Sequence, residues 1–473
     1  MYLTKIRMDF QRVCLFTALL FAFITGISSK APIEDICHSY VHPSLGQIGA
    51  CIPETDCQSG DLVANACPQY PSNYQCCFDE NNPGREVRGA WVATVDNIDW
   101  PRSPSNNVST QQADLIFLVD RMEAAGINTI YFQVRPAGDA LYISSIEPWS
   151  EYLTGSQGQA PSPLWDPLQF IIDYAHDKGI EVHAWINPYR ASLRPSWDHL
   201  ASNHMAKLFP QYAYIFSTFG WMDPGAQEVQ NRTYDVAIDL VTRYDIDGLH
   251  MDDYFYPYPV TGEYFPDNRT YDAYLQSGGN MSVPDWRRDN VNKLMERLYQ
   301  GVHAVKPRIV FSISPFGLYR PGEPEGMPSP ITGLDQYSQL YCDPKLWLER
   351  GWVDVLQPQL YWAILPPQQS YPVLLDWWLQ QNPLGRHVYA GNYLSRVETQ
   401  GWPLSEIRDQ VAISRETVHR SRGSWGNVMF SAKMFRDNFE GTVDYFHENV
   451  YKYPALQPLF PWLEGNSSSS KLK

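Results

Sequence analysis

Basic residues are in deficit in this chain of 473 residues. Lys and Arg number 36 against 52 Asp and Glu, which gives a formal charge of −16. Nucleic acid and anionic membrane surfaces are themselves negative and would repel such a chain. The composition therefore argues against both as partners. It also favours a folded protein with a large core, because 44% of the residues are hydrophobic.

Long apolar runs are missing beyond the first part of the chain. The one candidate is Val13–Ile27, a stretch of 15 residues that follows Lys5, Arg7 and Arg12. A membrane-spanning helix needs about 20 apolar residues, so this stretch is short for a span and is typical of a signal peptide. We therefore expect residues 1–29 to be a signal peptide and the mature protein to be secreted and extracellular. An uncleaved membrane anchor is the alternative.

Cysteine is scarce except in one short segment. Of the eight cysteines, Cys14 lies in the expected signal peptide, Cys342 stands alone, and six fall within residues 37–78. The six are Cys37, Cys51, Cys57, Cys67, Cys76 and Cys77. No Cys-x-x-Cys pair occurs among them, and export favours oxidation over zinc binding. The segment is predicted to be a disulfide-rich module with all six bridged, in a pairing left open by the spacing, and Cys342 to be a buried free thiol. The cysteine order resembles the small clip-type modules of secreted invertebrate proteins.

Acceptor sites for N-glycosylation agree with a secretory route. The Asn-x-Ser/Thr pattern occurs at Asn107, Asn231, Asn268, Asn280 and Asn466. We expect these side chains at the surface. The last of them lies in a low-complexity tail, residues 464–473, which is predicted to be disordered.

Strand-like and helix-like patterns alternate over residues 86–463. Eight apolar, β-branched runs begin at Val87, Ile127, Ile180, Ile246, Arg308, Asp354, His387 and Asn427. Helical patterns lie between them; one has Asp166 as N-cap, Pro167 in the first turn and Gly179 as its stop. This order predicts an α/β fold, a (β/α)8 TIM-type barrel. A doubly wound open sheet is the alternative, but no glycine-rich phosphate loop follows the first strand.

Alternation along the strands predicts which side chains enter the barrel. The expected inward set is Tyr131, Gln133, Arg135, His183, Trp185, Asn187, Gly248, His250, Asp252, Ser312, Ser314, Gln357, Gln359, Tyr361, Ser431 and Lys433. A purely structural barrel fills its interior with branched aliphatic residues, and unsatisfied buried polar groups cost free energy. The polar interior therefore indicates a functional site. By the same rule Asp253 should leave its strand on the opposite face and hold the next loop.

Four segments together resemble the glycosyl hydrolase-like 10 family. They read "REVRGAWVATVDNIDWP", "YFQVRPAGDALYISSIEPWSEYLTG", "AWINPYR" and "YDIDGLHMDDYFYP", and the resemblance extends over residues 85–461. It implies a barrel related to bacterial envelope or secreted lipoproteins, one of which cleaves peptidoglycan glycan strands stripped of their peptides. The cysteine module and the glycosylation sites depart from that family.

Glycoside cleavage usually needs two carboxyl groups, one donating a proton and one acting as nucleophile or base. Asp252 is the predicted nucleophile or base. Asp139 is the first candidate for the acid, and its alternative interpretation is a turn residue after Gly138. Glu147 and Glu263, both expected in loops, are the other candidates for the acid. Asp253 would take over catalysis if the alternation broke at Asp252.

The remaining polar and aromatic residues are assigned to substrate binding. Those predicted to contact sugar are Arg135, Asn187, His250, Gln357, Tyr361 and Lys433, with ring platforms at Trp100, Trp149 and Tyr254–Tyr258. No cofactor or metal is expected, although His183, His250 and Asp252 could form a facial set of metal ligands. The sequence thus predicts a secreted glycoside hydrolase acting on an N-acetylhexosamine-containing glycan. The alternative is an inactive barrel that binds glycan without cleaving it.

Overall fold

A computed structural model describes residues 36–42, 48–105, 107–322, 333–365 and 370–464. The expected signal peptide, the glycosylation site at Asn466 and almost all of the expected tail lie outside these ranges. Among the described helices, none combines the length and the apolar character that a bilayer crossing requires.

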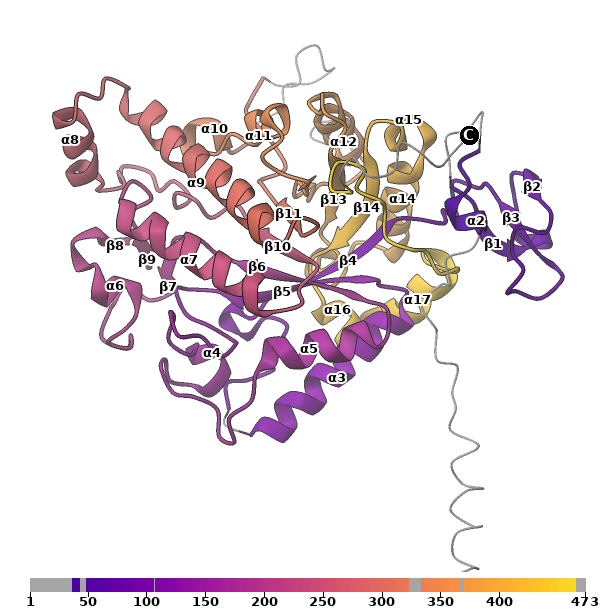
Figure 1. Ribbon diagram of the computed structural model, residues 1–473, viewed down its shortest axis with the longest axis horizontal. Coiled ribbons are helices and arrows are strands. Elements are labelled where there is room, and N and C mark those ends of the chain that lie inside the picture. Colours follow the sequence, from indigo (N-terminus) through magenta and orange to yellow (C-terminus); the bar gives the residue numbers. More distant parts are fainter. Residues whose placement is uncertain (1–35, 43–47, 106, 323–332, 366–369, 465–473) are drawn as a thin grey trace, which may run out of the picture.

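Eight parallel strands close into a barrel, and each corresponds to one of the eight runs expected from the sequence (Figure 1). The strands are β4 (Val87–Val92), β5 (Thr129–Arg135), β6 (Glu181–Ile186), β10 (Gly248–Met251), β11 (Val310–Ile313), β12 (Val355–Leu356), β13 (His387–Asn392) and β14 (Ser424–Met429). Their order around the barrel is β10-β11-β12-β13-β14-β4-β5-β6. The predicted α/β barrel is confirmed.

One helix after each strand covers the outside of the barrel. These helices are α3 (Val108–Ala124), α5 (Pro167–His176), α7 (Gln227–Arg243), α9 (Val283–Val305), α11 (Pro344–Arg350), α12 (Tyr371–Gln380), α14 (Leu404–Arg415) and α17 (Thr442–Asn449). Helix α5 begins as expected, because the Asp166 carboxylate accepts hydrogen bonds from the amides of Leu168 and Gln169.

Further helices lie in the connections. They are α4 (Glu151–Thr154), α6 (Met205–Leu208), α8 (Asn268–Gln276), α10 (Gln336–Gln339), α13 (Arg396–Gln400), α15 (Thr417–Arg420) and α16 (Lys433–Arg436).

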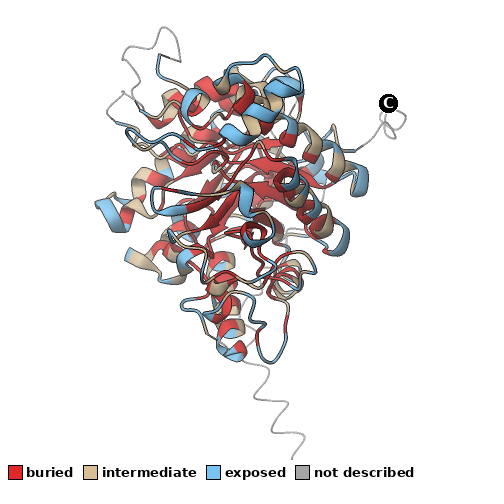
Figure 2. Cartoon of the chain, turned by 90° about the vertical axis from the view of Figure 1, so that its left-hand side faces the viewer, coloured by how far each residue is buried: buried red, intermediate tan, exposed pale blue. Residues whose placement is uncertain are grey.

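The strands bury both faces, as the alternation requires. Ile130, Phe132 and Val134 of β5 belong to the large core between the strands and the helices. Tyr131 on the same strand and Trp185 on β6 belong to a second, smaller core inside the barrel. Figure 2 shows these buried strands at the centre of the molecule and the exposed residues on the outer helices and loops. The predicted inward and outward faces of β5 and β6 are therefore confirmed over their regular length.

A small antiparallel sheet after β6 was not anticipated. It consists of β7 (Arg190–Ser192), β8 (Ala213–Phe216) and β9 (Phe219–Met222) in the order β7-β9-β8. A tight turn with Ser217 at φ 54° joins β8 to β9. The apolar run on each side of a Ser-Thr pair was the available signal for this hairpin. The sheet lies beside the mouth of the barrel and forms part of the candidate site described below.

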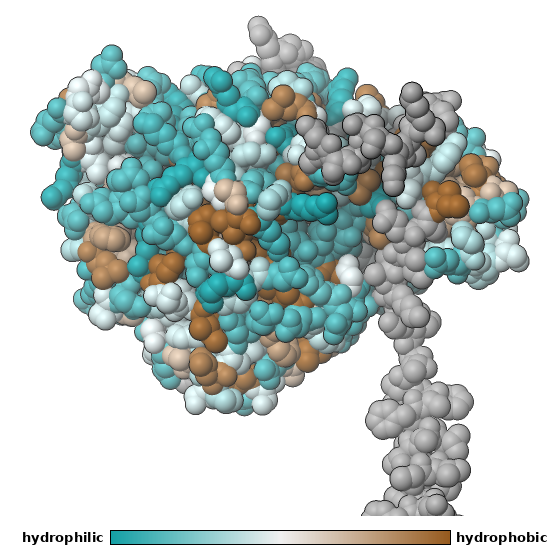
Figure 3. Space-filling model, viewed as in Figure 1, coloured by the Kyte–Doolittle hydropathy of each residue, from teal (hydrophilic) through white to brown (hydrophobic). Residues whose placement is uncertain are grey.

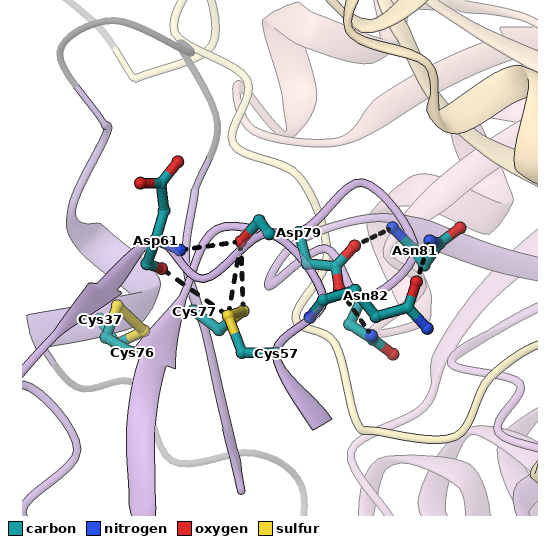
Figure 4. The surroundings of a disulfide bond; sticks show 10 residues. Cys37, Cys57, Asp61, Cys76, Cys77, Asp79, Asn81 and Asn82 are labelled. Atoms are coloured by element: carbon teal, nitrogen blue, oxygen red, sulfur yellow. Dashed lines mark hydrogen bonds between the residues drawn. A yellow bond between two sulfur atoms is a disulfide. The ribbon is translucent and has the colours of Figure 1, made fainter. Parts of the chain in front are cut away.

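The six cysteines of the N-terminal module are all paired, as predicted. The bonds join Cys37 to Cys76, Cys51 to Cys67 and Cys57 to Cys77, and Cys342 is free and buried. The module consists of α2 (Ile36–Ser39) and a sheet with the order β1 (Ala50–Pro53), β3 (Tyr74–Cys77), β2 (Leu62–Val63). Figure 4 shows two of the bonds next to Asp79, whose carboxylate accepts from the Asn81 amide at 2.9 Å where the chain leaves the module.

The module packs against the C-terminal part of the chain. Asp56 forms an ion pair with Lys452 at 2.7 Å and a hydrogen bond with Tyr453. Arg85 Nε donates to the carbonyl of His38 at 3.0 Å. These contacts hold the module at one end of the molecule (Figure 1).

The paired replacement Cys51→Ala/Cys67→Ala should loosen the module alone. The bond closes a loop with a sequence separation of 16 residues, and a loop of that size is worth about 3 kcal/mol. We expect hydrogen exchange of the β1 and β3 amides to speed up by roughly a hundredfold. The amides of the barrel strands serve as the internal control. Unchanged exchange in β1 and β3 would show that the bond adds nothing to the module's stability.

Four of the five expected glycosylation sites can be placed. Asn107, Asn231, Asn268 and Asn280 are all exposed, as the prediction requires. The molecular face drawn in Figure 3 is mostly hydrophilic, with hydrophobic residues in separate patches.

Candidate active site

A cavity of about 380 Å³ opens at the carboxyl ends of the barrel strands. Every barrel strand contributes a lining residue, on the strand or just after it. One from each is Trp91, Gln133, Trp185, Asp252, Ser314, Gln359, Tyr393 and Phe430. Functional residues of β/α barrels are placed at this end because the loops there are free to vary.

A second cavity of about 640 Å³ continues the first. The two share Val95, Ile98, Arg190, Tyr254 and Tyr258 in their walls. The second extends to the small sheet, where Phe219 and Trp221 line it. Together they form a continuous groove with many aromatic side chains, and Asp96 is a carboxyl group in the lining of the second cavity.

Asp252 lies in the wall of the first cavity and is 4% exposed. Its carboxyl group accepts from Trp185 Nε1 at 3.1 Å and from Asn187 Nδ2 at 3.1 Å. Burial raises the pKa of Asp252 to about 7, and the neighbouring Asp253 adds to this, against the effects of Arg190 and the two donors. A carboxyl group with this pKa can give and take a proton near neutral pH. It suits a proton donor better than the predicted role of nucleophile or base, because both of those roles require the ionised form.

Asp253 lines the same cavity, so the prediction that it faces away is wrong. Strand β10 ends at Met251, and alternation no longer governs the residues that follow it. The Asp253 carboxylate accepts a hydrogen bond from the hydroxyl of Tyr258, which also ties it to the loop as expected. Burial raises the pKa of Asp253, and the hydrogen bonds from Tyr258 and Gln359 oppose the rise. Two neighbouring carboxyl groups therefore share one cavity.

His250 is part of the barrel's interior and not of the cavity wall. Its Nε2 accepts from Trp91 Nε1 at 3.0 Å and its Nδ1 bonds to Ser312 Oγ at 2.8 Å. Burial holds the pKa of His250 well below its usual value, so the ring is neutral. Both nitrogens are engaged. The structure therefore does not support His250 as a sugar-binding residue or as one of a facial set of metal ligands with His183 and Asp252.

The expected acid, Asp139, does not reach the cavity. It is fully buried in the turn after Gly138, where its carboxylate accepts from the Ala137 amide at 3.0 Å. Burial raises its pKa to about 6. The turn interpretation is the one that the structure favours. Glu263, the other distant alternative, is exposed and accepts from the Ser217 amide.

Arg135 and Glu147 form a buried ion pair behind the site. Arg135 Nη2 lies 2.7 Å from Glu147 Oε1, and both side chains are 0% exposed. Arg232 adds a second ion pair to Glu147 at 3.0 Å. Burial alone would raise the pKa of Glu147, but the two guanidinium groups lower it overall. Arg135 is thus a structural residue and is unavailable to a substrate, contrary to prediction.

Four more predicted binding residues act elsewhere. Gln357 is buried and donates to Tyr131 at 2.7 Å, and Trp100 is a core residue that donates to the Gln111 carbonyl. Lys433 lies at the start of α16 and pairs with Glu398 at the surface. Asn187 contacts Asp252, so its role is to position that carboxyl group.

Asn187 positions Asp252 through a chain of bonds. Its Oδ1 accepts from the Arg190 amide at 2.9 Å, which orients Nδ2 toward Asp252. Arg135 Nη1 donates to the Asn187 carbonyl at 2.5 Å. The buried ion pair therefore supports the residue that holds Asp252.

Tyr361, Tyr254 and Tyr258 do line the groove, as predicted. Between the last two, Phe255 and Tyr256 are core residues. Arg190 was not among the predicted site residues; its guanidinium lies 4.7 Å from the centre of the Tyr254 ring. Trp91, Tyr393 and Phe430 were not predicted as lining residues either. The position of Arg190 three residues after Asn187, in a segment quoted for the family resemblance, was the available signal.

Gln133 offers a free donor to the cavity. Its Oε1 accepts from the amides of Thr94 and Val95 at 3.0 and 2.9 Å. Its Nε2 is buried and has no hydrogen-bond partner among the described residues. Unpaired buried donors are rare and costly, so a group that accepts this hydrogen bond is expected in the cavity.

The chain is similar to known proteins over most of its length. The profile of the family Glycosyl hydrolase-like 10 matches residues 86–402. The glycosyl hydrolase YngK of Bacillus subtilis (strain 168) is 36% identical over 399 residues, which cover 82% of this chain and 76% of YngK. The glycosyl hydrolase DigH of Escherichia coli (strain K12) is 36% identical over 64% of this chain and 72% of DigH. Among solved structures, the PgaB (BpsB) glycoside hydrolase domain of Bordetella bronchiseptica covers 78% of this chain and 100% of that domain, with a TM-score of 0.48 and 14% identity.

Proposed function

The chain belongs to the glycosyl hydrolase-like 10 family, and from that premise we propose that it is a secreted glycoside hydrolase. Its proposed substrate is a glycan that contains N-acetylhexosamine, such as peptidoglycan strands freed of their peptides. The observation that carries the proposal is Asp252, a buried carboxyl group with a pKa of about 7 in the wall of the mouth cavity.

The chemistry follows from the two carboxyl groups. Asp252 is protonated for half of its population near pH 7, so it can donate a proton to the leaving glycosidic oxygen. We assign the role of ionised partner to Asp253, because hydrogen bonds from Tyr258 and Gln359 oppose the rise that burial causes in its pKa. Trp185 and Asn187 fix the orientation of Asp252 in the cavity.

The groove suits a chain of sugars better than a single ring. The two continuous cavities have volumes of about 380 and 640 Å³. The aromatic faces of Tyr254, Tyr258 and Trp221 offer platforms on which the apolar faces of sugar rings can pack. A polymer lying along the groove would place one of its internal linkages at Asp252.

The direct test is incubation of the secreted protein with glycan strands from which peptides have been removed. Mass spectrometry should detect shorter oligosaccharides that increase with time. Binding of the strands without any cleavage would support the alternative, an inactive barrel that retains its groove. The proposal would be overturned if the protein failed both to bind and to cleave this glycan and N-acetylated chitooligosaccharides.

Activity should fall as pH rises through about 7. The pKa of Asp252 is raised, so its proton-donating form is present below that pH and is lost above it. The pH profile of kcat/KM, which reports the free enzyme, should show this descending limb. The hydrogen bond from Trp185 lowers the pKa of Asp252, so in Trp185→Phe the limb should move to higher pH. A limb below pH 5 would assign the proton donor to another group.

A further inference from the structure

Both carboxyl groups of the mouth cavity come from one corner of the barrel. Asp252 and Asp253 follow strand β10 directly, and consecutive Cα atoms are only about 3.8 Å apart. They are the only carboxyl-bearing side chains among the described residues that line this cavity. A substrate in this cavity therefore meets carboxyl groups from a single side, and the next carboxyl group along the groove is Asp96 in the second cavity.

The opposite side of the mouth is aromatic. In the closed order of strands, β14 lies four strands away from β10. Phe430, which follows β14, lies 5.7 Å from Tyr393 and 6.3 Å from Trp91, measured between ring centres. Tyr361 lies 6.0 Å from Phe430 and continues this wall. None of these side chains carries a carboxyl group, and burial raises the pKa of the Tyr361 phenol well above its usual value, so that phenol stays protonated and is a poor nucleophile.

Displacement at the sugar's C1 requires attack from the face opposite the leaving oxygen. If Asp252 protonates the leaving oxygen, its neighbour Asp253 approaches from nearly the same direction. We propose that the nucleophile is the carbonyl oxygen of the substrate's own 2-acetamido group, with Asp253 accepting the hydrogen bond of the acetamido N–H. This inference rests on the proposed function and makes the substrate class a 2-acetamido sugar.

The steps balance without any further reactant than water. The acetamido oxygen bonds to C1, the glycosidic C1–O bond breaks, and the leaving oxygen takes the proton of Asp252. Asp253 takes the acetamido N–H proton, which leaves a bicyclic oxazoline. Water then attacks C1 and gives a proton to the Asp252 carboxylate, while the ring C1–O bond breaks and the nitrogen recovers its proton from Asp253. Two inversions retain the configuration at C1.

The cavity provides the other contacts that an acetamido group needs. The aromatic wall of Trp91, Tyr361, Tyr393 and Phe430 suits its methyl group, because these faces are apolar. The unpaired Nε2 of Gln133 is a donor in the same cavity and can bind a sugar or acetamido oxygen. These two features are independent of the carboxyl pair and fit the same ligand.

A thiazoline made from chitobiose tests the inference by binding alone. In this stable compound sulfur replaces the attacking oxygen, so it mimics the bicyclic intermediate. Calorimetry should give a Kd at least about 100-fold lower than that of N,N′-diacetylchitobiose. Asp253→Asn should remove most of this difference, whereas Asp272→Asn, an exposed carboxylate on α8, should leave it unchanged.

The possible outcomes separate the inference from the proposed function. If glycan strands are cleaved but the thiazoline binds no more tightly than the parent sugar, the acetamido mechanism is wrong and the glycosidase remains. If neither cleavage nor tight binding occurs, both fail. A second measurement uses fluorogenic chitobiosides with mono-, di- and trifluoroacetamido groups. Turnover should fall by orders of magnitude along this series, because fluorine weakens the carbonyl as a nucleophile; equal rates would overturn the inference.

Discussion

Asp252→Asn is expected to lower kcat/KM for glycan cleavage by about 10²–10⁴-fold, the usual contribution of a positioned acid or base. The amide has nearly the same shape as the carboxyl group but does not donate a proton at neutral pH. Trp185 Nε1 can still donate to the remaining oxygen, so the cavity should keep its form. Reducing-end assays give the rate, and calorimetry with an uncleaved oligosaccharide should show near-normal affinity.

Asp272→Asn is the matched control, because it makes the same chemical change at an exposed position on α8. It should retain full activity. Equal activity of Asp252→Asn and the control would show that Asp252 takes no part in the chemistry. The assignment would then move to Asp253, which lines the same cavity.

Glu147→Gln is expected to lower the free energy of unfolding by about 3–5 kcal/mol, the usual result of removing one partner from a buried ion pair. Arg135 would remain 0% exposed without its counter-charge, and Arg232 would lose its ion pair as well. Urea denaturation followed by tryptophan fluorescence measures this loss. Activity should fall too, because Arg135 supports the carbonyl of Asn187 and Asn187 positions Asp252.

Glu398→Gln provides the comparison at the surface. Its partner Lys433 is 35% exposed, and the pair is held at 2.7 Å in contact with solvent. Solvent screening limits the contribution of such a pair to the free energy of unfolding to less than about 1 kcal/mol. If both variants lost the same free energy of unfolding, burial would not make the Glu147 ion pair more important for stability than the surface pair.

Local sequence determined the barrel and its module. Eight apolar runs alternate with helical patterns. A closed parallel barrel buries one face of its strands inside and the other under the helices, so this order predicted the barrel. The period of two predicted that Tyr131 and Trp185 enter the interior and that Ile130 and Val182 face the helices. Six cysteines in an otherwise cysteine-poor chain predicted the disulfides, although their spacing left the pairing open.

The three-dimensional packing decided the site. Alternation is a property of extended backbone, and it stops where β10 ends at Met251. The sequence therefore predicted that Asp252 faces the barrel mouth, which the structure shows, but it placed Asp253 on the wrong face. Whether an inward polar group meets a substrate depends on partners elsewhere in the chain: Arg135 is engaged by Glu147 and the Asn187 carbonyl, and His250 by Trp91 and Ser312. Local periodicity fixes the direction of a side chain, but only the folded barrel determines whether another residue has already occupied its hydrogen-bonding groups.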